Sequence, residues 1–538
     1  MWNLGWRDHI WSCLDQDWDM IIIGGGITGA GLLREAVQKS LKVLLVDAGD
    51  FSSGTSSKSS KMVHGGFRYL KNRQFGVTHQ AVREREWMLR EAPDLVTSLG
   101  FVVPFYKHPH RTRWEFATGL AIYDLMAWKW DHHHFDRSQL LHICPELNQS
   151  GLSGGYLYYD AEMDDSRLVL RILREAVAGG GLALNYASVD ALLCDRSGRV
   201  SGVLLRDTSG LRQRIQECRA KVVVNAAGPW SDTVRDKIAA PPRLRKLRGS
   251  HLIFRHADFP LRQAVTLVHP EDHRSMFALP WEGVTVIGTT DLDHASSPSD
   301  DVFATDQEID YILQVANATF PALGLGREDI LSTFSGLRPV INTGKAKPSQ
   351  ESRAHVTWDE RGLITITGGK LTTFRVMATE ALCRAQPYLS DKIKFEPRPV
   401  MFNTPPVVDF SDQLNPAVNA RLSGRYGIEL TGFLLEANPA ELKPVDSLPC
   451  LWAELRRAAR CEGVVHLDDL LLRRVRLGLL LPDGAAAWMS QIKSIVQPEL
   501  DWDEARWQEE EARYCEIWRE TFSPCPEAHR FQAVAYVS

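Results

Sequence analysis

Several large protein classes are excluded by what the sequence lacks. Its nine cysteines are scattered, and the last four, Cys450, Cys461, Cys515 and Cys525, show no C-x-x-C spacing. This distribution forms no disulfide framework and argues against an iron–sulfur or zinc module. No run approaches about 18 consecutive apolar residues, and residues 1–19 lack the basic and apolar regions of a secretory signal. We therefore expect a cytoplasmic protein with no membrane-spanning helix.

The net charge and the length of the chain limit its binding partners and its number of domains. The formal net charge of −5 at pH 7 gives no general attraction to nucleic acid. At 538 residues the chain is long enough for two or three domains with a large apolar core. Any anionic ligand must therefore be held by local groups rather than by overall charge.

A pattern near the N-terminus predicts a dinucleotide-binding unit. Residues 19–23 (DMIII) read as a short buried strand, and a glycine-rich turn, GGGITG, follows at 24–29. A helix-forming run to about residue 40 and a second apolar strand at 43–46 come next, and Asp47 ends that strand. These are the parts of a βαβ dinucleotide fold. A glycine loop alone often arises by chance, but here the surrounding elements agree with it.

Each glycine of this turn has an expected role. Gly24 permits the tight turn, Gly26 lets a pyrophosphate approach the backbone, and Gly29 lets the helix pack closely on the sheet. Asp47 is placed to accept hydrogen bonds from the adenosine ribose. The cofactor-binding residues expected in this unit are Gly24, Gly26, Ile27, Thr28, Gly29 and Asp47.

The segment after this unit favours FAD over NAD. Residues 52–60 (SSGTSSKSS) are polar and suited to wrapping amides and hydroxyls around a pyrophosphate and a flavin. They are too long for an ordinary loop between a strand and a helix. A flexible linker is the alternative interpretation of such a composition. The segment runs directly into residues 62–70 (MVHGGFRYL), however, which are not linker-like.

The string SSKSSKMVHGGFRYL at 56–70 resembles the signature of the FAD-dependent glycerol-3-phosphate dehydrogenases. The resemblance spans nearly the whole chain in the family's order, through YYDAEMDDSRLV (158–169), VVNAAGPWSD (223–232), RGSHLIF (248–254), FALPWEGVTVIGTTD (277–291), SGLRPV (335–340) and ITGGKLTTFR (366–375). It implies an α/β plus α+β chain of the D-amino-acid oxidase-like class. That fold has a Rossmann-type FAD-binding domain, a substrate domain on an antiparallel sheet and a C-terminal helical domain.

The domains that the resemblance implies are interleaved within residues 1–403. The expected FAD-binding segments are about 18–75, 155–240 and 355–395, and the expected substrate segments are about 76–154 and 241–354. Pro405 and Pro406 open a polar stretch that marks a boundary near 403. Residues 404–538 are expected to form the helical domain.

Periodicity predicts the main elements. Helices are expected at about 76–98, 113–130, 307–319, 371–387, 446–479 and 501–520. A strand–turn–strand unit is expected at 190–207, a buried strand at 221–226, and further strands within 250–291. The basic run at 243–248, with alternating leucines, predicts an edge strand with a charged exposed face.

The resemblance also implies a substrate pocket for an anion. Arg68 and Arg338 stand where the family places pocket arginines, and Arg353 stands where related enzymes bind the substrate phosphate. Arginine suits this role because its planar fork matches phosphate oxygens. Arg353 is followed by Ala354-His355, where some members have Asp-Tyr, so the neighbouring contacts differ. The remaining expected substrate contacts are Tyr69, Thr289 and Thr290.

Two further residues are expected to act in catalysis with Arg338. His251 matches a family histidine of the substrate pocket and is the first candidate for the proton acceptor. A core histidine with satisfied nitrogens is the alternative, and Arg338 could instead polarise the hydroxyl while the proton leaves through water. Lys370 follows a Gly-Gly pair and would favour the anionic reduced flavin. Its alternative is a solvated lysine after a turn.

The same motifs imply the remaining cofactor contacts. In the first signature they are Thr55, Ser56, Ser57, Ser60, Lys61, His64, Gly65 and Gly66. In the later motifs they are Ala227, Gly228, Gly369, Lys370, Leu371 and Thr372.

Three other signals are interpreted as structural. His132, His133 and His134 point in different directions along the chain and are not expected to bind a metal. Asp164 or Asp165 is expected to cap the following helix, although with Asp160 they mimic a carboxylate cluster. Trp2, Trp6 and Trp11 could share one side of a short interfacial helix, but packing on the protein's own surface is preferred.

The function that the resemblance implies is oxidation of sn-glycerol 3-phosphate to dihydroxyacetone phosphate. Hydride would pass from C2 to flavin N5, and the electrons would go to a membrane quinone. The expected location is the cytoplasmic face of the inner membrane, bound peripherally, with a homodimer as one option for the assembly. The alternatives are an oxidase that uses O₂, an amino-acid oxidase of the same fold, and a flavin-binding scaffold without activity.

Overall fold

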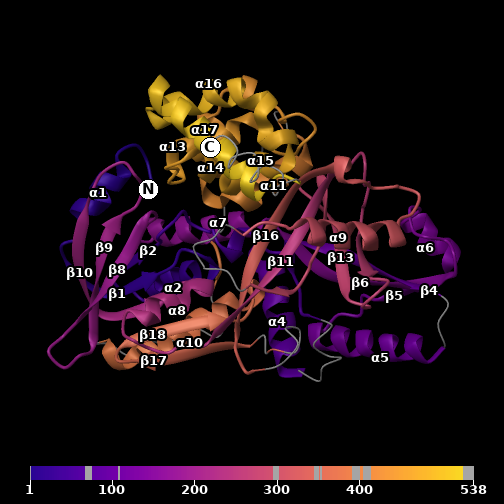
Figure 1. Cartoon of the computed structure of the whole chain (residues 1–538), viewed down its shortest axis with the longest axis horizontal. Helices are drawn as coiled ribbons and strands as arrows, with labels where there is room; N and C mark the ends of the chain where they lie inside the picture. Colours follow the sequence, from indigo (N-terminus) through magenta and orange to yellow (C-terminus); the bar gives the residue numbers. More distant parts are fainter. Residues whose placement is uncertain are drawn as a thin grey trace, which may run out of the picture.

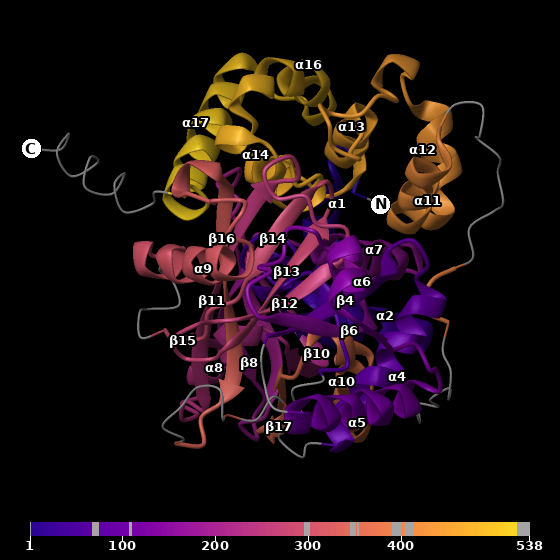
Figure 2. The same ribbon diagram turned by 90° about the vertical axis from the view of Figure 1, so that its right-hand side faces the viewer.

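The computed structural model describes residues 2–66, 75–106, 110–294, 302–344, 351, 354–389, 400–403 and 414–524. Two β-sheet regions lie side by side, and a helical region covers one end of both (Figures 1 and 2). The expected D-amino-acid oxidase-like arrangement of mixed sheets with a C-terminal helical domain is confirmed.

The first sheet is built around buried parallel strands. Its order is β17-β18-β10-β1-β2-β7, and β10 and β2 flank β1 in parallel register. The last four residues of β1 and all of β2 are buried, as expected where helices cover both faces. The strands are β1 Asp17–Ile23, β2 Val43–Val46, β7 Leu182–Leu184, β8 Ala187–Cys194, β9 Val200–Asp207, β10 Ile215–Asn225, β17 His355–Glu360 and β18 Leu363–Gly368.

Three helices pack together on this sheet. Helix α2 contacts both α7 and α10 and carries buried apolar residues along its length. The three are α2 Ile27–Gln38, α7 Asp165–Ala178 and α10 Phe374–Ala385. The expected dinucleotide unit and the strand–turn–strand unit at 190–207 are therefore confirmed as elements.

The second sheet is mostly antiparallel. Its order is β15-β11-β14-β13-β12-β4-β6-β3, with β16 on β11 and β5 on β6. The strands are β3 Met62–Val63, β4 Val96–Tyr106, β5 His133–Phe135, β6 Leu152–Met163, β11 Leu244–Arg255, β12 Ala264–Val268, β13 Ser275–Trp281, β14 Val284–Gly288, β15 Leu292–Asp293 and β16 Ile330–Ile341. Its helices are α4 Phe75–Glu91, α5 His110–Ala127, α6 Arg137–Ile143 and α9 Asp306–Thr319.

The C-terminal region is helical and shares an apolar core with the second sheet. Trp281 and Phe334 of that sheet cluster with Leu471, Trp507 and other buried residues of the helices. The main helices are α11 Pro416–Tyr426, α12 Leu430–Glu436, α13 Trp452–Cys461, α16 Met489–Leu500 and α17 Glu504–Thr521. The domain is thus packed on the sheet rather than tethered beside it.

Three local predictions need correction. Helix α4 ends at Glu91, and β4 begins at Val96, so the expected helix at 76–98 is too long. The basic run at 243–248 lies in β11, which has β16 on one side and β14 and β15 on the other, so it is not an edge strand. The stretch at 446–479 is broken into short helical pieces.

The basic run is accommodated inside the sheet because its charges are paired. Arg245 bonds Asp293 through two oxygens at 2.5 and 2.6 Å, and Arg248 pairs with Glu308 at 2.9 Å. Leu247 between them is fully buried. The charges of this strand are therefore tolerated because acidic residues on neighbouring elements pair with them.

The structural interpretations of the N-terminal tryptophans and of Asp164 are confirmed. Trp2 and Trp11 are buried, at 3% and 8% exposure, and Asp164 caps α7 by accepting from the backbone N–H of Arg167. His132 bonds Asp124 at 2.6 Å. Within the described residues, no cluster of three or more metal-ligating side chains occurs and no helix is both long and apolar enough to cross a membrane.

Candidate functional site

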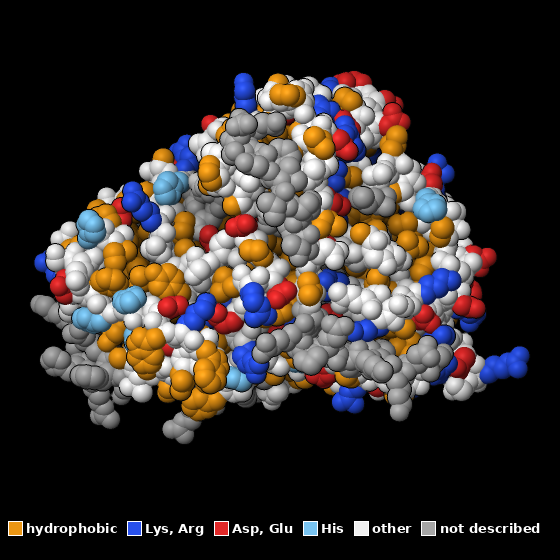
Figure 3. Space-filling model, turned by 180° about the vertical axis from the view of Figure 1, so that it is seen from behind, with side chains coloured by type: hydrophobic (Ala, Val, Ile, Leu, Met, Phe, Trp, Pro, Cys, Tyr) orange, Lys and Arg blue, Asp and Glu red, His pale blue; other side chains and the backbone are white. Residues whose placement is uncertain are grey.

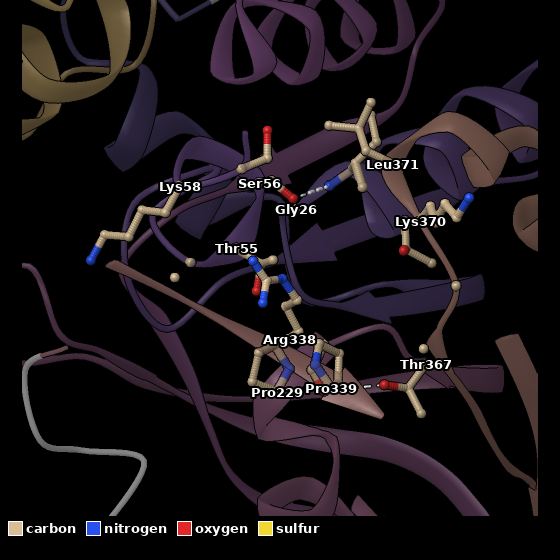
Figure 4. Close-up of a pocket in the computed structure, with 18 of the residues that line it drawn as sticks. Gly26, Thr55, Ser56, Lys58, Pro229, Arg338, Pro339, Thr367, Lys370 and Leu371 are labelled. Atoms are coloured by element: carbon tan, nitrogen blue, oxygen red, sulfur yellow. Dashed lines mark hydrogen bonds between the residues drawn. The ribbon is translucent and has the colours of Figure 1, made fainter. Parts of the chain in front are cut away.

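A large cavity lies between the two sheets. Its volume is about 1150 Å³, which exceeds the roughly 300–1,000 Å³ of an ordinary small-ligand pocket. Figure 4 draws two of its walls, with Thr55, Ser56 and Lys58 on one and Thr367 and Lys370 on the other. The space is large enough for a dinucleotide and a small substrate together.

The glycine turn between β1 and α2 forms one end of the cavity. Gly24 has a φ of 115°, and a Cβ there would lie 2.6 Å from the carbonyl oxygen of Ala226. A Cβ on Gly29 would lie 1.8 Å from the carbonyl oxygen of Gly24, so the helix can approach the turn only with glycine. Gly24, Gly26, Ile27 and Thr28 line the cavity, whereas Gly29 packs behind them.

Asp47 lies beside this turn at the end of β2. Its carboxylate accepts the backbone N–H of Gly25 at 2.6 Å and that of Gly49 at 2.9 Å. Burial raises the pKa of Asp47 to about 6, against the opposing effect of these two bonds. Asp47 therefore carries its charge at neutral pH and lines the cavity where a ribose hydroxyl would be held.

The serine-rich segment after β2 forms a side wall. The Oγ of Ser56 accepts the backbone N–H of Ile27 at 2.9 Å and closes the wall onto the glycine turn. Of the residues expected here, Thr55, Ser56, Ser60, His64 and Gly66 line the cavity. Ser57, Lys61 and Gly65 do not; they are buried behind the wall.

His251, on β11, lies where the serine-rich wall meets the second sheet. Its Nε2 is 2.8 Å from the Oγ of Ser60, and its ring stacks on Phe334 with centroids 4.5 Å apart. The pKa of His251 lies well below its ordinary value because burial disfavours the charged form and because Arg338 and Lys61 add positive charge nearby. The imidazole is therefore neutral at pH 7 and can accept a proton.

Arg338, on β16, enters the cavity beside His251. It donates to Asp291 at 3.0 Å, to the Oγ1 of Thr289 at 2.8 Å and to the carbonyl oxygen of Thr290 at 3.2 Å. Arg274 approaches the other oxygen of Asp291 at 3.4 Å. One buried carboxylate thus orients two guanidinium groups, and the trio keeps a net positive charge toward the cavity.

Thr289 and Thr290 differ in their placement. Thr289 lines the cavity, as expected for a substrate contact. The hydroxyl of Thr290 instead donates to Glu308 at 2.7 Å, and its side chain is buried away from the cavity lining. Glu308 also accepts from Ser250 at 2.8 Å, so this network holds the turn that carries Thr289.

The segment after β18 forms the opposite wall. Gly369, Lys370, Leu371 and Thr372 line the cavity, and the N-cap of a short helix at Leu371–Thr373 is Lys370. Burial, followed by the charge of Lys370, lowers the pKa of His64 to about 4. Lys370 therefore acts electrostatically on this part of the cavity. Ala227 and Gly228 at the end of β10 complete the lining between the walls.

Arg68, Tyr69 and Arg353 lie outside the described residues, so their expected substrate contacts are not located. Other lining residues were not anticipated from sequence. They include Asp291, Arg274 and Trp230, and the aromatic group Phe101, Phe116, Tyr158 and Phe277. Asp291 ends the motif at 277–291, but its role depends on ion pairs with Arg274 and Arg338, which the motif alone does not indicate.

The chemistry of the lining fits a flavin dinucleotide. The glycine turn can take a close pyrophosphate, Asp47 can take a ribose, and Lys370 places positive charge on the far wall. Arg338 and Arg274 add positive charge to the lining of the same cavity. The arrangement can therefore hold a cofactor against a small anionic substrate.

Comparison with protein families gives two matches. Residues 19–375 match the family described as FAD dependent oxidoreductase. Residues 366–507 match the family described as C-terminal domain of alpha-glycerophosphate oxidase. Together these matches cover both sheets and most of the helical region.

Individual relatives agree with these matches. The chain is 35% identical over 526 residues to "Glycerol-3-phosphate dehydrogenase 2" of Mycobacterium tuberculosis, covering 93% of this chain and 88% of that protein. It is 37% identical to the "Aerobic glycerol-3-phosphate dehydrogenase" of Staphylococcus aureus, covering 70% of this chain and 68% of that protein. The crystal structure of a glycerol-3-phosphate dehydrogenase from Bacillus halodurans complexed with FAD aligns with a TM-score of 0.76 and 28% identity, over 98% of this chain and 99% of that one.

Proposed function

This chain belongs to the family of FAD-dependent glycerol-3-phosphate dehydrogenases, and we propose that it oxidises sn-glycerol 3-phosphate to dihydroxyacetone phosphate and passes the electrons to a membrane quinone. The observation that carries this proposal is one cavity lined by two sets of residues. The glycine turn and Asp47 belong to one set, and Arg338 and His251 belong to the other. A cofactor and an anionic substrate would therefore meet within a single space.

FAD, when bound, supplies the acceptor for hydride from C2 of the substrate at flavin N5. The residues of the chain bind, orient and handle the proton. Arg338, with Arg68 and Arg353, would hold the phosphate, since guanidinium groups match phosphate oxygens. Asp291 keeps Arg338 in place through the 3.0 Å bond. Arginine so fixed loses little freedom when the substrate binds.

His251 would take the proton of the C2 hydroxyl. Its lowered pKa keeps the ring neutral at physiological pH, which a proton acceptor requires. Ser60 lies at hydrogen-bond distance from Nε2 and lines the cavity, so it can pass the proton or yield its place to the substrate hydroxyl. Lys370 on the opposite wall would stabilise the negative charge that develops near it.

Two features support a hydrophobic electron acceptor, one inside the cavity and one on the surface. The aromatic group Phe101, Phe116, Tyr158 and Phe277 gives one limb of the cavity an apolar wall that a small polar substrate does not need. Helix α5 and the turn after it expose an apolar ridge: Ile122 at 37%, Leu125 at 68%, Trp128 at 89% and Trp130 at 68%. Hydrophobic side chains gather in this region at the lower left of Figure 3.

The ridge suits peripheral contact with the cytoplasmic face of the inner membrane, because exposed tryptophans favour the lipid headgroup region. Trp128 and Trp130 flank Lys129, which pairs with Glu86 at 2.9 Å, so the proposed contact depends on the apolar side chains. Assembly as a homodimer remains a prediction that light scattering of the purified protein would check.

The experiment is an anaerobic titration of the FAD-loaded protein with glycerol 3-phosphate, followed by addition of air or a soluble quinone. Bleaching of the flavin band with fast recovery by quinone and slow recovery by air is expected. Fast recovery by air would identify an oxidase. No bleaching in a protein that retains FAD would reject glycerol 3-phosphate, and D- or L-amino acids would then be tested as donors.

A further inference from the structure

Lys61 is a buried charge that the proposed chemistry does not use. It is fully buried behind the serine-rich wall, with its Nζ 2.9 Å from both oxygens of Asp165 and 2.7 Å from the carbonyl oxygen of Ser57. The rings of Phe334 and Trp281 lie on its other sides, at 4.6 and 5.1 Å. These contacts fix the side chain of Lys61, and its bond to Ser57 fixes the backbone of residues 57–61.

Asp165, the first residue of α7, forms several hydrogen bonds to residues 57–61. Besides Lys61, it accepts the backbone N–H of Ser59 at 3.0 Å and the hydroxyl of Ser59 at 2.7 Å. Residues 57, 59 and 61 are thus all fixed by one carboxylate or by the lysine that it pairs with. Ser60 lies between these anchors, with its side chain turned to the cavity.

The second partner of Asp165 comes from the C-terminal helical region. Arg476 bonds Asp165 directly, and it also bonds Asp164 at 3.0 Å and the carbonyl oxygen of Ser57 at 3.3 Å. Its side chain is 2% exposed. The helical region therefore reaches through a buried arginine to the back of the wall that carries Ser60.

We infer that the C-terminal helical domain positions the proton-handling pair of the site: Arg476, through Asp165, fixes the segment 57–61 so that Ser60 holds the Nε2 of His251. The 2.8 Å contact between Ser60 and His251 is the far end of this chain of bonds. Arg476, Asp165 and Lys61 are positioning residues, since none of them lines the cavity. This inference rests on the proposed function for the proton-handling role of His251 and for the substrate used in its kinetic test.

The kinetic test compares Ser60→Ala, Asp165→Asn and the double variant in the FAD-loaded protein. The rate of anaerobic flavin reduction by glycerol 3-phosphate should fall about tenfold in each single variant, the value of one lost hydrogen bond. The double variant should be no slower than Ser60→Ala alone, because both changes remove the same contact. Losses that multiply in the double variant would overturn the inference.

Glu462→Gln is the matched control. Glu462 makes a buried two-bond pair with Arg167 of α7, at 2.7 and 2.7 Å, and so joins the same two parts of the molecule. Like Asp165→Asn, it changes a buried carboxylate to an amide, but it does not touch residues 57–61. Its reduction rate should stay within about twofold of wild type. Equal losses in the two variants would mean that the interface as a whole, and not Asp165, sets the rate.

A spectroscopic measurement separates this inference from the identity of the substrate. The imidazole ¹⁵N resonance of His251 in the FAD-loaded protein is assigned by its loss in His251→Gln. It should shift in Ser60→Ala and in Asp165→Asn and stay unchanged in Glu462→Gln. An unchanged resonance in Asp165→Asn would refute the positioning role, even if glycerol 3-phosphate proved not to be the substrate.

Arg476→Lys covers the case in which Asp165→Asn does not fold. Arg476 donates to Asp164, to Asp165 and to the carbonyl oxygens of Ser57 and Leu472. Lysine keeps the buried charge but has only three N–H donors and no planar fork, so it cannot serve these four acceptors together. The His251 resonance should move in the same direction as in Ser60→Ala. A resonance and a reduction rate identical to wild type would reject the role of Arg476.

Discussion

Arg338 and Asp291 form a 3.0 Å ion pair at the wall of the cavity, and the carboxylate is 1% exposed. Arg274 shares the same carboxylate from the other side at 3.4 Å. A buried acid in an anion-binding cavity would repel the substrate if it stood alone. Flanked by two arginines, it instead fixes their direction while the trio remains positive.

Replacing Arg338 with leucine should lower kcat/KM for glycerol 3-phosphate by about 100-fold, because a charge-assisted bond to the phosphate is lost and Asp291 loses its 3.0 Å ion pair. Steady-state kinetics with a soluble quinone would measure this. Arg255→Leu is the control, since Arg255 pairs with Asp258 at an exposed position. An unchanged KM and kcat in Arg338→Leu would remove it from the substrate site.

Replacing His251 with glutamine should lower the rate of flavin reduction by about 10²–10⁴-fold, the usual contribution of a general base. In the wild type, the pKa of His251 is depressed by burial and then by Arg338 and Lys61. His251 therefore becomes protonated, and stops acting as a base, only when the pH falls well below 6.5. The rate of flavin reduction should stay constant as the pH falls to that point.

The variant Arg338→Leu should also change the pH dependence of activity, because Arg338 lowers the pKa of His251. Removing one positive neighbour raises the pKa of His251, so the acid limb of its residual activity should move to higher pH. Profiles of kcat/KM against pH for both proteins would test this. A limb at the same pH in both would exclude His251 as the titrating base.

Gly26→Ala should weaken FAD binding by about tenfold or more while leaving the fold intact. An added Cβ would lie 3.0 Å from the Oγ of Ser56 and occupy the space where a pyrophosphate approaches the backbone. Gly76→Ala is the control, because a Cβ there meets nothing within 4 Å. Fluorescence titration of the apoprotein with FAD would compare them, and equal affinities would place the pyrophosphate elsewhere.

The double variant Trp128→Ser/Trp130→Ser should bind anionic lipid vesicles about tenfold more weakly than wild type, because two large exposed apolar side chains are removed. Leu435→Ser changes an equally exposed residue, at 76%, on α12 and should leave binding unaltered. Co-sedimentation with vesicles is the measurement. Equal loss in the two variants would contradict a membrane contact localised on the α5 ridge.

Glu462→Gln should lower the free energy of unfolding by about 3–5 kcal/mol, since it leaves Arg167 buried without its counter-charge. Arg167 and nearby arginines outweigh burial and lower the pKa of Glu462 to about 2. A depressed carboxyl pKa stabilises the fold above pH 4.5, by about 3 kcal/mol, and this contribution is lost as the pH falls from 4.5 toward 2.

Chemical unfolding at several pH values would measure both effects. In Glu462→Gln the decline of stability between pH 4.5 and 2 should be shallower than in wild type. Glu217→Gln, which breaks an exposed pair with Arg219, should change neither quantity measurably. A wild-type slope in Glu462→Gln would show that other carboxylates carry the acid sensitivity.

The local motifs of this chain could be predicted from sequence because their geometry is encoded over short distances. The glycine turn at 24–29 and the strands on either side have a spacing that few other structures share. The sequence predicts an edge strand for the basic run at 243–248, because its partners, Asp293 and Glu308, lie far along the chain. Without knowledge of these ion pairs, a charged run does not look like an interior strand.

In the site, too, local motifs could be predicted from sequence, but contacts between distant residues could not. His251 and Arg338 could be placed through their motifs, but the contact of Ser60 with His251 spans 191 positions and has no local signal. Lys61 stands in a cofactor motif yet faces away from the cavity, because its ammonium group pairs with the buried carboxylate of Asp165. Sequence identifies the segment, and only tertiary pairing decides which side of it each residue faces.

The discontinuous order of the first sheet has a consequence for biosynthesis. Strand β10 lies between β1 and β18, so the sheet cannot close until residue 368 has left the ribosome. Until then a nascent chain displays the glycine turn without the opposite wall at 369–372. A cofactor that needs both walls can therefore bind only after both have been synthesised, and until then the early apolar strands lack their partners and are prone to aggregate.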